Sequence, residues 1–324
     1  MAFVLERGLL LWLLLLSLAA LFWPSLGVSV PDPFVGAKPA LDAMIAVTML
    51  AIGSLLPRDE VVQVARRWPT VLGGTAVQYA AMPLLAFSTA WAFGFEGAAL
   101  VGVTVVGCVP GAMASNVLSL AARANVSYSV SLTTTATLLS PILVPLTLKL
   151  TLGQWRAFPA GQVSFNLLLT VVLPVLAGYG LSRWWRGWQQ SARLWGPIVA
   201  NLVILWIIAV VVGLNRERLL VFDPSILTAL LLINLGGYLA GNLGGRALRL
   251  DRPMRRALTL EVGMQNAGLG TYIVLTVFPN DPAAAIPPAL YTFGCMLTGT
   301  ILARIWAEFG AGQGGGPFEP EGQR

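Results

Sequence analysis

Ten apolar stretches, each close to the length of a membrane-spanning helix, follow one another along this chain and leave few folds open to it. A helix needs about 20 mainly apolar residues to cross a bilayer. The stretches are residues 8–23, 39–56, 69–93, 98–122, 127–150, 160–182, 195–214, 224–246, 257–278 and 284–306. Charged residues make up 10% of the chain, whereas soluble domains carry about 25%. The sequence therefore predicts an all-α polytopic membrane protein with ten transmembrane helices.

The first stretch, RGLLLWLLLLSLAALF, is short for a span and is also compatible with a cleaved signal peptide. It continues into WPSLG without the small-residue cleavage site of a secretory signal, which favours a retained first helix.

Basic residues in the connecting loops predict the orientation. If the N-terminus is cytoplasmic, the inner side holds fifteen Lys and Arg residues against five outside, and cytoplasmic loops are rich in such residues. The inner set is Arg7, Arg58, Arg66, Arg67, Arg123, Arg183, Arg186, Arg193, Arg246, Arg249, Arg252, Arg255, Arg256, Arg304 and Arg324, and the outer set is Lys38, Lys149, Arg156, Arg216 and Arg218. We therefore expect both termini in the cytoplasm, an inner-membrane location, and no nucleic-acid partner despite the net charge of +6.

The connection at 151–160 divides the ten predicted spans into five and five. An odd number per half makes the second half enter the membrane upside down, which is the plan of an inverted-repeat transporter. The expected units are a first repeat at 1–152, an inverted second repeat at 153–309, and a Gly-rich, disordered cytoplasmic tail at 310–324.

Two of these spans are interrupted by polar and helix-breaking residues. The fourth contains VPGAMASNVLSLA (109–121), and the ninth contains EVGMQNAGLG (261–270). Asn116 lies seven residues before Arg123, and Asn266 lies ten after Arg256, so at about 1.5 Å per residue the interruptions reach similar depths. Paired interruptions in the two halves are typical of a transporter binding site.

The interruptions bring several hard oxygen donors into apolar segments, with Glu261 as the one carboxylate. The others at the two breaks are the amides of Gln265, Asn266 and Asn116, the hydroxyl of Ser115, and the carbonyls of Val262 and Met264. Ser129 and Thr133 lie four residues apart on one face of the fifth span, so both hydroxyls can point the same way. Such a set favours Na⁺, or a proton on Glu261, over a divalent ion. Helix N-termini at the breaks would attract an anion. Histidine is absent and Cys108 and Cys295 lie in apolar runs, so no soft-metal cluster is expected.

Structural interpretations compete with the functional ones. Glu261 could form an ion pair with a nearby arginine, and Pro110 could produce a simple kink. Gly268 and Gly270 could allow neighbouring helices to pack closely. Threonines of the run 133–137 are compatible with hydrogen bonds to their own helix. An intramembrane enzyme would need a set of catalytic side chains, and the predicted spans do not offer one. A channel is a further alternative, but paired interruptions are more typical of a carrier.

Three motifs resemble those of the bile acid:sodium symporter family: PGAMASN at 110–116, SYSVSLTTTATLLSPILVP at 127–145 and EVGMQNAG at 261–268. The resemblance extends over the ten-span layout. It implies a panel domain of spans 1, 2, 6 and 7 and a core domain of spans 3–5 and 8–10, with the broken fourth and ninth helices crossing in the core. It also implies sodium-coupled import of an organic anion, such as a bile acid or a small carboxylate of the pantoate or 2-keto acid type.

The resemblance further implies two sodium ions. Sodium 1 would use Ser115, Asn116, Ser129, Thr133 and Glu261, and sodium 2 would use Gln78, Glu261, Val262, Met264 and Gln265. For the substrate we expect Asn116, Asn266, Met113 and Ala114. A proton-coupled anion carrier that titrates Glu261 is the alternative function. Expected partners are the organic anion, sodium and membrane lipid, with no obligatory protein partner and no enzymatic activity.

Overall fold

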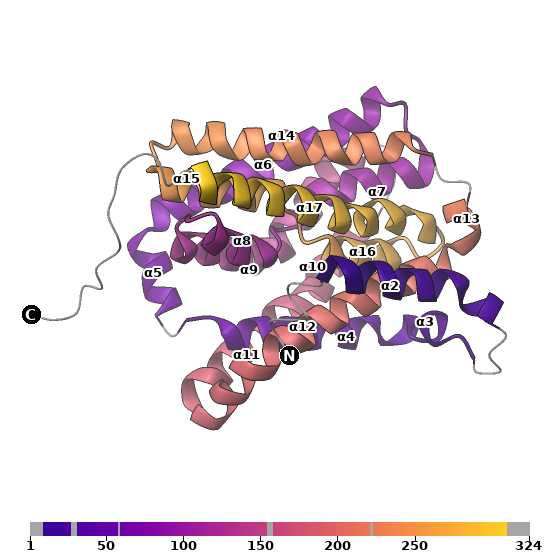
Figure 1. Cartoon of the computed structure of the whole chain (residues 1–324), viewed down its shortest axis with the longest axis horizontal. Coiled ribbons are helices and arrows are strands. Elements are labelled where there is room, and N and C mark those ends of the chain that lie inside the picture. Colours follow the sequence, from indigo (N-terminus) through magenta and orange to yellow (C-terminus); the bar gives the residue numbers. More distant parts are fainter. Residues whose placement is uncertain (1–8, 27–30, 58, 154–157, 221–222, 310–324) are drawn as a thin grey trace, which may run out of the picture.

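The computed structural model describes residues 9–26, 31–57, 59–153, 158–220 and 223–309, and all of its regular elements are helices (Figure 1). Within these ranges the only β-type pairing is an isolated bridge between Gly111 and Gln265. The predicted tail at 310–324 and the first eight residues of the predicted first repeat lie outside the described residues.

The chain follows a simple order of helices. The first half contains α2 (Leu9–Phe22), η1 (Trp23–Leu26), α3 (Pro33–Gly36), η2 (Lys38–Ala40), α4 (Leu41–Leu55), α5 (Glu60–Arg66), α6 (Trp68–Ala92), α7 (Gly97–Cys108), α8 (Ala114–Ala121) and α9 (Val126–Leu152). The second half contains α10 (Ala160–Leu167), η3 (Leu168–Val172), α11 (Leu173–Trp184), α12 (Arg186–Leu214), α13 (Arg216–Leu220), α14 (Ser225–Ala247), α15 (Arg252–Gly263), α16 (Ala267–Val277), η4 (Pro282–Ala285) and α17 (Ile286–Phe309).

Seven helical segments of the described chain are long and apolar enough to cross a bilayer, which confirms the prediction of an all-α polytopic membrane protein. They are Pro33–Leu55, Trp68–Ala92, Val126–Leu152, Ala160–Trp184, Arg186–Leu214, Ser225–Ala247 and Pro282–Glu308. The first predicted stretch forms the shorter helix α2, and the fourth and ninth are each divided into two short helices. The count of ten spans in two inverted repeats stays a prediction.

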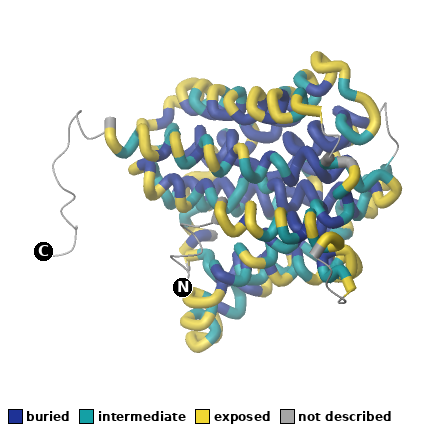
Figure 2. Tube along the Cα trace, turned by 45° about the vertical axis from the view of Figure 1, so that its right-hand side comes forward, coloured by how far each residue is buried: buried dark blue, intermediate teal, exposed yellow. Residues whose placement is uncertain are grey.

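The helices pack in two groups. In one, α4 packs against α11 and α12, and α12 against α2; in the other, α6 packs against α7, α9 and α14, and α14 against α15 and α17. Figure 1 shows the first group in the lower half of the view and the second in the upper half. Buried residues concentrate in the interior and exposed residues lie along the outer helices (Figure 2). Many of the exposed residues are leucines. Apolar side chains on an outer surface suit a protein solvated by lipid.

Side-chain caps mark where the helices of the second group begin. Asn125 accepts a hydrogen bond from the Tyr128 N–H at the start of α9, and Asp251 accepts one from Met254 N–H at the start of α15. Each cap satisfies an N–H that has no partner within its own helix. The carboxylate of Asp251 thereby fixes the point from which α15 runs into the group.

Candidate functional site

The two interrupted segments meet at their breaks. The Asn266 N–H donates to the Pro110 carbonyl at 2.8 Å, and the Ala112 N–H donates to the Met264 carbonyl at 2.7 Å. These two bonds form the antiparallel bridge centred on Gly111 and Gln265. Backbone outside a helix must find partners when it is buried in an apolar medium, and here each break satisfies the other. Pro110 therefore lies in a true gap between α7 and α8 rather than at a kink.

Glu261 lies beside this crossing, on the last turn of α15, and its side chain is fully buried. The Ser115 hydroxyl of α8 donates to Oε2 at 2.5 Å. The Thr133 hydroxyl of α9 lies 2.8 Å from Oε1 and 2.7 Å from Oε2. The carboxylate thus joins α8, α9 and α15, and the partners that the structure gives it are neutral hydroxyls rather than an arginine.

Gly111 allows the carboxylate to reach the crossing. A Cβ atom at this position would lie 2.1 Å from Oε1 and 2.6 Å from Cδ of Glu261, closer than any real contact. Gly268 is different, because a Cβ there would have its nearest neighbour at 3.6 Å, an ordinary contact. The need for a residue without a side chain is therefore explained by close contact at Gly111, whereas Gly268 has no such close contact.

Hydrogen-bond acceptors outnumber donors around Thr133. Its single hydroxyl hydrogen faces both oxygens of Glu261, the Asn116 Oδ1 at 3.3 Å and the Ser129 carbonyl at 3.1 Å. Oε2 also accepts the Ser115 hydroxyl, but Oε1, the Asn116 Oδ1 and the Ser129 carbonyl compete for the one Thr133 hydrogen, and a buried acceptor without a donor is costly. A monovalent cation, or a proton on Glu261, would satisfy these oxygens. Among the described residues, no group of three or more His, Cys, Asp or Glu side chains is placed to hold a metal ion.

The predicted ligands of sodium 1 converge, with one qualification for Ser129. Ser115, Asn116, Thr133 and Glu261 all meet in the hydrogen bonds described above. The Ser129 hydroxyl instead accepts a bond from the Ser119 hydroxyl at 3.1 Å, while its carbonyl faces Thr133. Ser129 therefore adjoins the cluster through its backbone in this structure.

Some of the residues predicted for sodium 2 are joined by a second set of hydrogen bonds at the crossing. The Gln78 Nε2 donates to the Gln265 Oε1 at 3.4 Å, and the Gln265 Nε2 donates to the Val262 carbonyl at 2.7 Å. The Gln78 Oε1 is buried and has no hydrogen-bond partner among the described residues. This unpartnered oxygen fits a cation. The Met264 carbonyl already accepts the Ala112 N–H, so it has one lone pair left to offer.

Two helices begin at the crossing. Met113 and Asn266 are the N-cap residues of α8 and α16, and Ala114 is the first residue of α8. The Asn266 Oδ1 caps α16 by accepting the Leu269 N–H at 3.0 Å, which leaves its amide hydrogens for another partner. The half-buried Asn116 presents its Oδ1 to Thr133. These N-termini form a positively polarised surface suited to an anion.

A buried network behind the crossing was not predicted from the sequence. The Gly263 carbonyl, at the end of α15, accepts hydrogen bonds from Asn234 Nδ2 and the Tyr291 hydroxyl, both at 2.7 Å. The Thr298 hydroxyl in turn donates to Asn234 Oδ1 at 2.6 Å. A lone asparagine in the apolar run LLLINLGG is the signal that could have identified this support.

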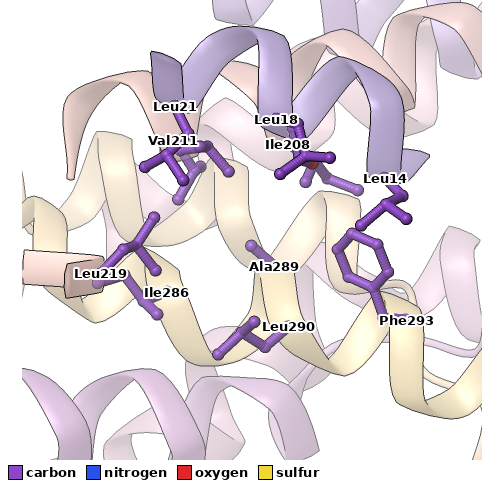
Figure 3. Close-up of a pocket in the computed structure, with 12 residues that line it drawn as sticks. Leu14, Leu18, Leu21, Ile208, Val211, Leu219, Ile286, Ala289, Leu290 and Phe293 are labelled. Carbon is purple, nitrogen blue, oxygen red and sulfur yellow. The ribbon is translucent and has the colours of Figure 1, made fainter. Parts of the chain in front are cut away.

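A separate apolar cavity of about 200 Å³ lies between α2, α12, α13 and α17 (Figure 3). Leu14, Leu18, Ile208 and Phe293 are among its walls, and Ser17 is its only polar side chain. None of the predicted sodium ligands lines it. The described residues that line the cavity include no charged side chain and offer a carboxylate one hydroxyl, that of Ser17, so the candidate site remains at the crossing.

A polytopic helical protein with a buried, oxygen-rich cluster where two interrupted helices cross has the structure of a secondary transporter. Comparison with known proteins agrees with that class. Residues 43–221 match the Sodium Bile acid symporter family. The chain belongs to this family of sodium-dependent transporters.

Curated relatives span bacteria, plants and animals. A Bacillus subtilis protein described as the uncharacterized sodium-dependent transporter YocS is 34% identical over 283 residues, which cover 87% of this chain and 88% of the relative. The probable sodium/metabolite cotransporter BASS1 of Arabidopsis thaliana chloroplasts is 30% identical, over 81% of this chain and 65% of the relative. The human sodium/bile acid cotransporter 4 is 30% identical, over 83% of this chain and 63% of the relative.

Proposed function

We propose that this protein is a symporter that uses a sodium gradient to import an organic anion by alternating access. The observation that carries the proposal is the fully buried carboxylate of Glu261, enclosed by neutral oxygen donors at the crossing. A buried carboxylate costs several kcal/mol unless a cation or a proton accompanies it. Membership of a sodium-dependent family makes sodium the cation of choice.

We assign two sodium ions to opposite sides of Glu261. The first would be held by Ser115, Asn116, Ser129, Thr133 and Glu261, and the second by Gln78, Glu261, Val262, Met264 and Gln265. The surplus of acceptors around Thr133 supports the first site, and the unpartnered Gln78 Oε1 supports the second. Both ions would bring helices around the crossing together, because their ligands come from α6, α8, α9, α15 and the α15–α16 connection.

The substrate's carboxylate would bind next to these ions, at the N-termini of α8 and α16. Met113, Ala114, Asn116 and Asn266 are the residues at those ends. Sodium would then promote anion binding by fixing the geometry of the crossing, and linkage requires each ligand to raise the other's affinity equally. Two relatives are named a sodium/bile acid cotransporter and a sodium/metabolite cotransporter. The substrate we propose is a bile acid or, as the family resemblance implies, a small carboxylate of the pantoate or 2-keto acid type.

Alternating access would come from movement between the two packing groups, which we equate with the panel and core domains. In this structure the groups contact each other through α16, η4 and α17 against α2, α4 and α12. The Tyr272 hydroxyl of α16 donates to the Asp42 carboxylate of α4 at 2.8 Å. With cytoplasmic termini, as the loop charges predict, this contact lies on the extracellular side of the crossing. It would close the outer entrance in an inward-facing state.

The test is binding and uptake with defined ions. A thermal-shift screen of small carboxylates, with and without sodium, should reveal acids that stabilise the protein more in sodium than in choline. Uptake of the selected acid into proteoliposomes should then require an inward sodium gradient. If no carboxylate acts together with sodium, and uptake is equal in sodium and choline, the proposal is wrong.

Proton coupling is the second candidate. The crowding of acceptors around Thr133 would also be relieved by a proton on Glu261. Uptake driven by a pH gradient without sodium would favour this mechanism, whereas uptake driven by a sodium gradient at fixed pH favours sodium symport.

A further inference from the structure

A groove between α14 and α17 differs in character from the crossing and from the apolar cavity. Its volume is about 330 Å³, and Thr259 of α15 contributes to its lining. The walls are Tyr238, Leu239, Asn242, Leu243 and Arg246 from α14 and Leu302 and Trp306 from α17. Tyr238, Asn242 and Arg246 recur every four residues and therefore share one face of α14.

The groove is polar at one end and apolar along the rest. Arg246 lies in the last turn of α14, with Asn242 one turn further into the bundle. Leu239 and Leu243 are 61% and 52% exposed, so they face outward beside the groove. In a membrane protein such exposed leucines contact lipid chains. The groove is thus open to the bilayer and has a cationic head and an apolar flank.

The cationic end is reinforced by a second guanidinium. The Arg256 Cζ lies 5.5 Å from the centre of the Trp306 ring, in a cation–π contact with this wall of the groove. One of its N–H groups donates to the Ala122 carbonyl at 3.0 Å, which holds the side chain in place. Arg249, Arg252 and Arg255 follow in the same loop and helix start.

Acidic residues offset only part of this charge. Asp251 is engaged as the cap of α15, and Glu308 is an exposed residue near the end of α17. Between residues 246 and 256 there are five arginines and a single aspartate. Arginines in a loop can act only to set the orientation of the protein in the membrane. A groove that places an arginine beside an apolar surface facing lipid, however, complements a ligand with an anionic headgroup and an apolar chain. Basic pockets between membrane helices on the cytoplasmic side suit anionic lipid headgroups.

We propose that this groove binds an anionic glycerophospholipid. Arg246 and Asn242 would donate hydrogen bonds to the phosphate, with Trp306 at the level of the headgroup. One acyl chain would lie along Leu239, Leu243 and Leu302. The site would be formed by α14, α15 and α17, and Thr259 in its floor is two residues from Glu261. A bound lipid would therefore brace the half-helix that carries the carboxylate.

Native mass spectrometry and thermal shift of the full chain in mild detergent test this proposal. Phosphatidylglycerol should remain bound and raise the melting temperature, whereas phosphatidylcholine with the same chains and inorganic phosphate should not. Arg246→Gln should weaken phosphatidylglycerol binding roughly fivefold, the contribution of one basic residue near an anionic surface. Asn242→Ala should weaken it less. Arg186→Gln, at the start of α12 in the other packing group, is the matched control and should bind as the wild type does.

Arg246→Lys keeps the charge and should retain most of the binding if Arg246→Gln fails to fold. Equal stabilisation by phosphatidylcholine and phosphatidylglycerol would overturn the proposal, because the groove would then bind acyl chains without regard to charge. Equal losses in Arg246→Gln and Arg186→Gln would also overturn it, since the effect would reflect general surface charge. Stabilisation by inorganic phosphate as strong as that by the lipid would identify a soluble anion site instead.

Discussion

The Cα of Gly111 lies directly against the carboxylate of Glu261, so closely that a methyl group at residue 111 would overlap Oε1 at 2.1 Å. The same glycine forms the antiparallel bridge to Gln265. The break of the first interrupted segment therefore shapes the space in which the carboxylate of the second one lies. The backbone crossing and the proposed sodium sites form a single structural unit.

Gly111→Ala should displace the Glu261 side chain while leaving the helices intact, because the clash is confined to the crossing. We expect the sodium-dependent rise in melting temperature to disappear and uptake to fall at least about tenfold, equivalent to about 1.4 kcal/mol of lost binding. Gly294→Ala in α17 is the control, since a Cβ there meets nothing within 4 Å. Normal sodium stabilisation in Gly111→Ala would show that the carboxylate position does not matter.

Thr133 should be required for its oxygen rather than for its size. Thr133→Val removes the hydroxyl that lies between the two oxygens of Glu261, and Thr133→Ser keeps it. We expect Thr133→Val to raise the sodium concentration for half-maximal uptake about tenfold or more. Thr133→Ser should stay near the wild type. If Thr133→Ser and Thr133→Val require the same sodium concentration for half-maximal uptake, the Thr133 hydroxyl is not a sodium ligand.

Substitution of Gln78 should affect the binding of the second sodium ion and not of the first. Its Oε1 is buried and has no hydrogen-bond partner among the described residues, and its Nε2 donates to the Gln265 Oε1. Gln78→Leu should keep the first ion and lose the second, so the sodium dependence of uptake should change from sigmoidal towards hyperbolic. Flux measured over a range of sodium concentrations checks this. A curve that stays sigmoidal would contradict the assignment of a second ion to Gln78.

Tyr272→Phe should favour opening on the side that the Tyr272–Asp42 hydrogen bond closes. Loss of one hydrogen bond to a charged group shifts such an equilibrium by about 1.5–3 kcal/mol. A single cysteine in α4 near Asp42 should then label faster with a water-soluble maleimide. Thr276→Ala is the control in the same helix, because among the described residues the Thr276 hydroxyl donates to carbonyls of α16 itself. Unchanged labelling in Tyr272→Phe would argue against a gate here.

Glu60 gives a pH dependence that is independent of the crossing. This residue begins α5, between two spans, and burial raises the pKa of its carboxyl above the ordinary 4.5, with a smaller lowering by Ser131. The folded protein thus holds the proton more tightly than the unfolded chain does. The contribution of Glu60 to the free energy of unfolding should be greatest below pH 4.5 and should fall as the pH rises from 4.5 to the raised pKa.

Glu60→Gln should remove that decline, and thermal melts over a pH series would measure it. Because Gln cannot ionise, the variant should be more stable than the wild type above the raised pKa and should show a flatter profile. An identical pH profile in the two proteins would mean that Glu60 is hydrated when folded.

The sequence predicted the parts of the site whose signals are local. Glu261, Gln265 and Asn116 are conspicuous because polar groups in apolar segments are costly, and Pro110 and Gly111 mark a break. The pairing of Ala112 with Met264 and of Asn266 with Pro110 could not be read from the sequence, because it depends on how two segments that are far apart in the chain cross. The roles of Gly111 and Asn234 depend on the same tertiary contacts.

The fold shows the same division. Helix positions follow from hydrophobic length, and the structure places helices along the predicted apolar stretches. The grouping of α4 with α11 and α12, and of α14 with α15 and α17, required the three-dimensional structure. Many exposed faces consist of leucines, as do buried ones, so composition cannot distinguish lipid-facing from protein-facing surfaces.

Uptake by Glu261→Gln in proteoliposomes with an imposed inward sodium gradient tests the proposed mechanism most directly. The amide keeps the shape and the hydrogen-bonding oxygen but removes the charge that two sodium ions would share. We expect a folded protein with no sodium-dependent uptake and no sodium-induced stabilisation, while Glu96→Gln, which changes an exposed carboxylate, should transport normally. Sodium-driven uptake close to the wild-type rate in Glu261→Gln would contradict the assignment of this carboxylate as the shared sodium ligand.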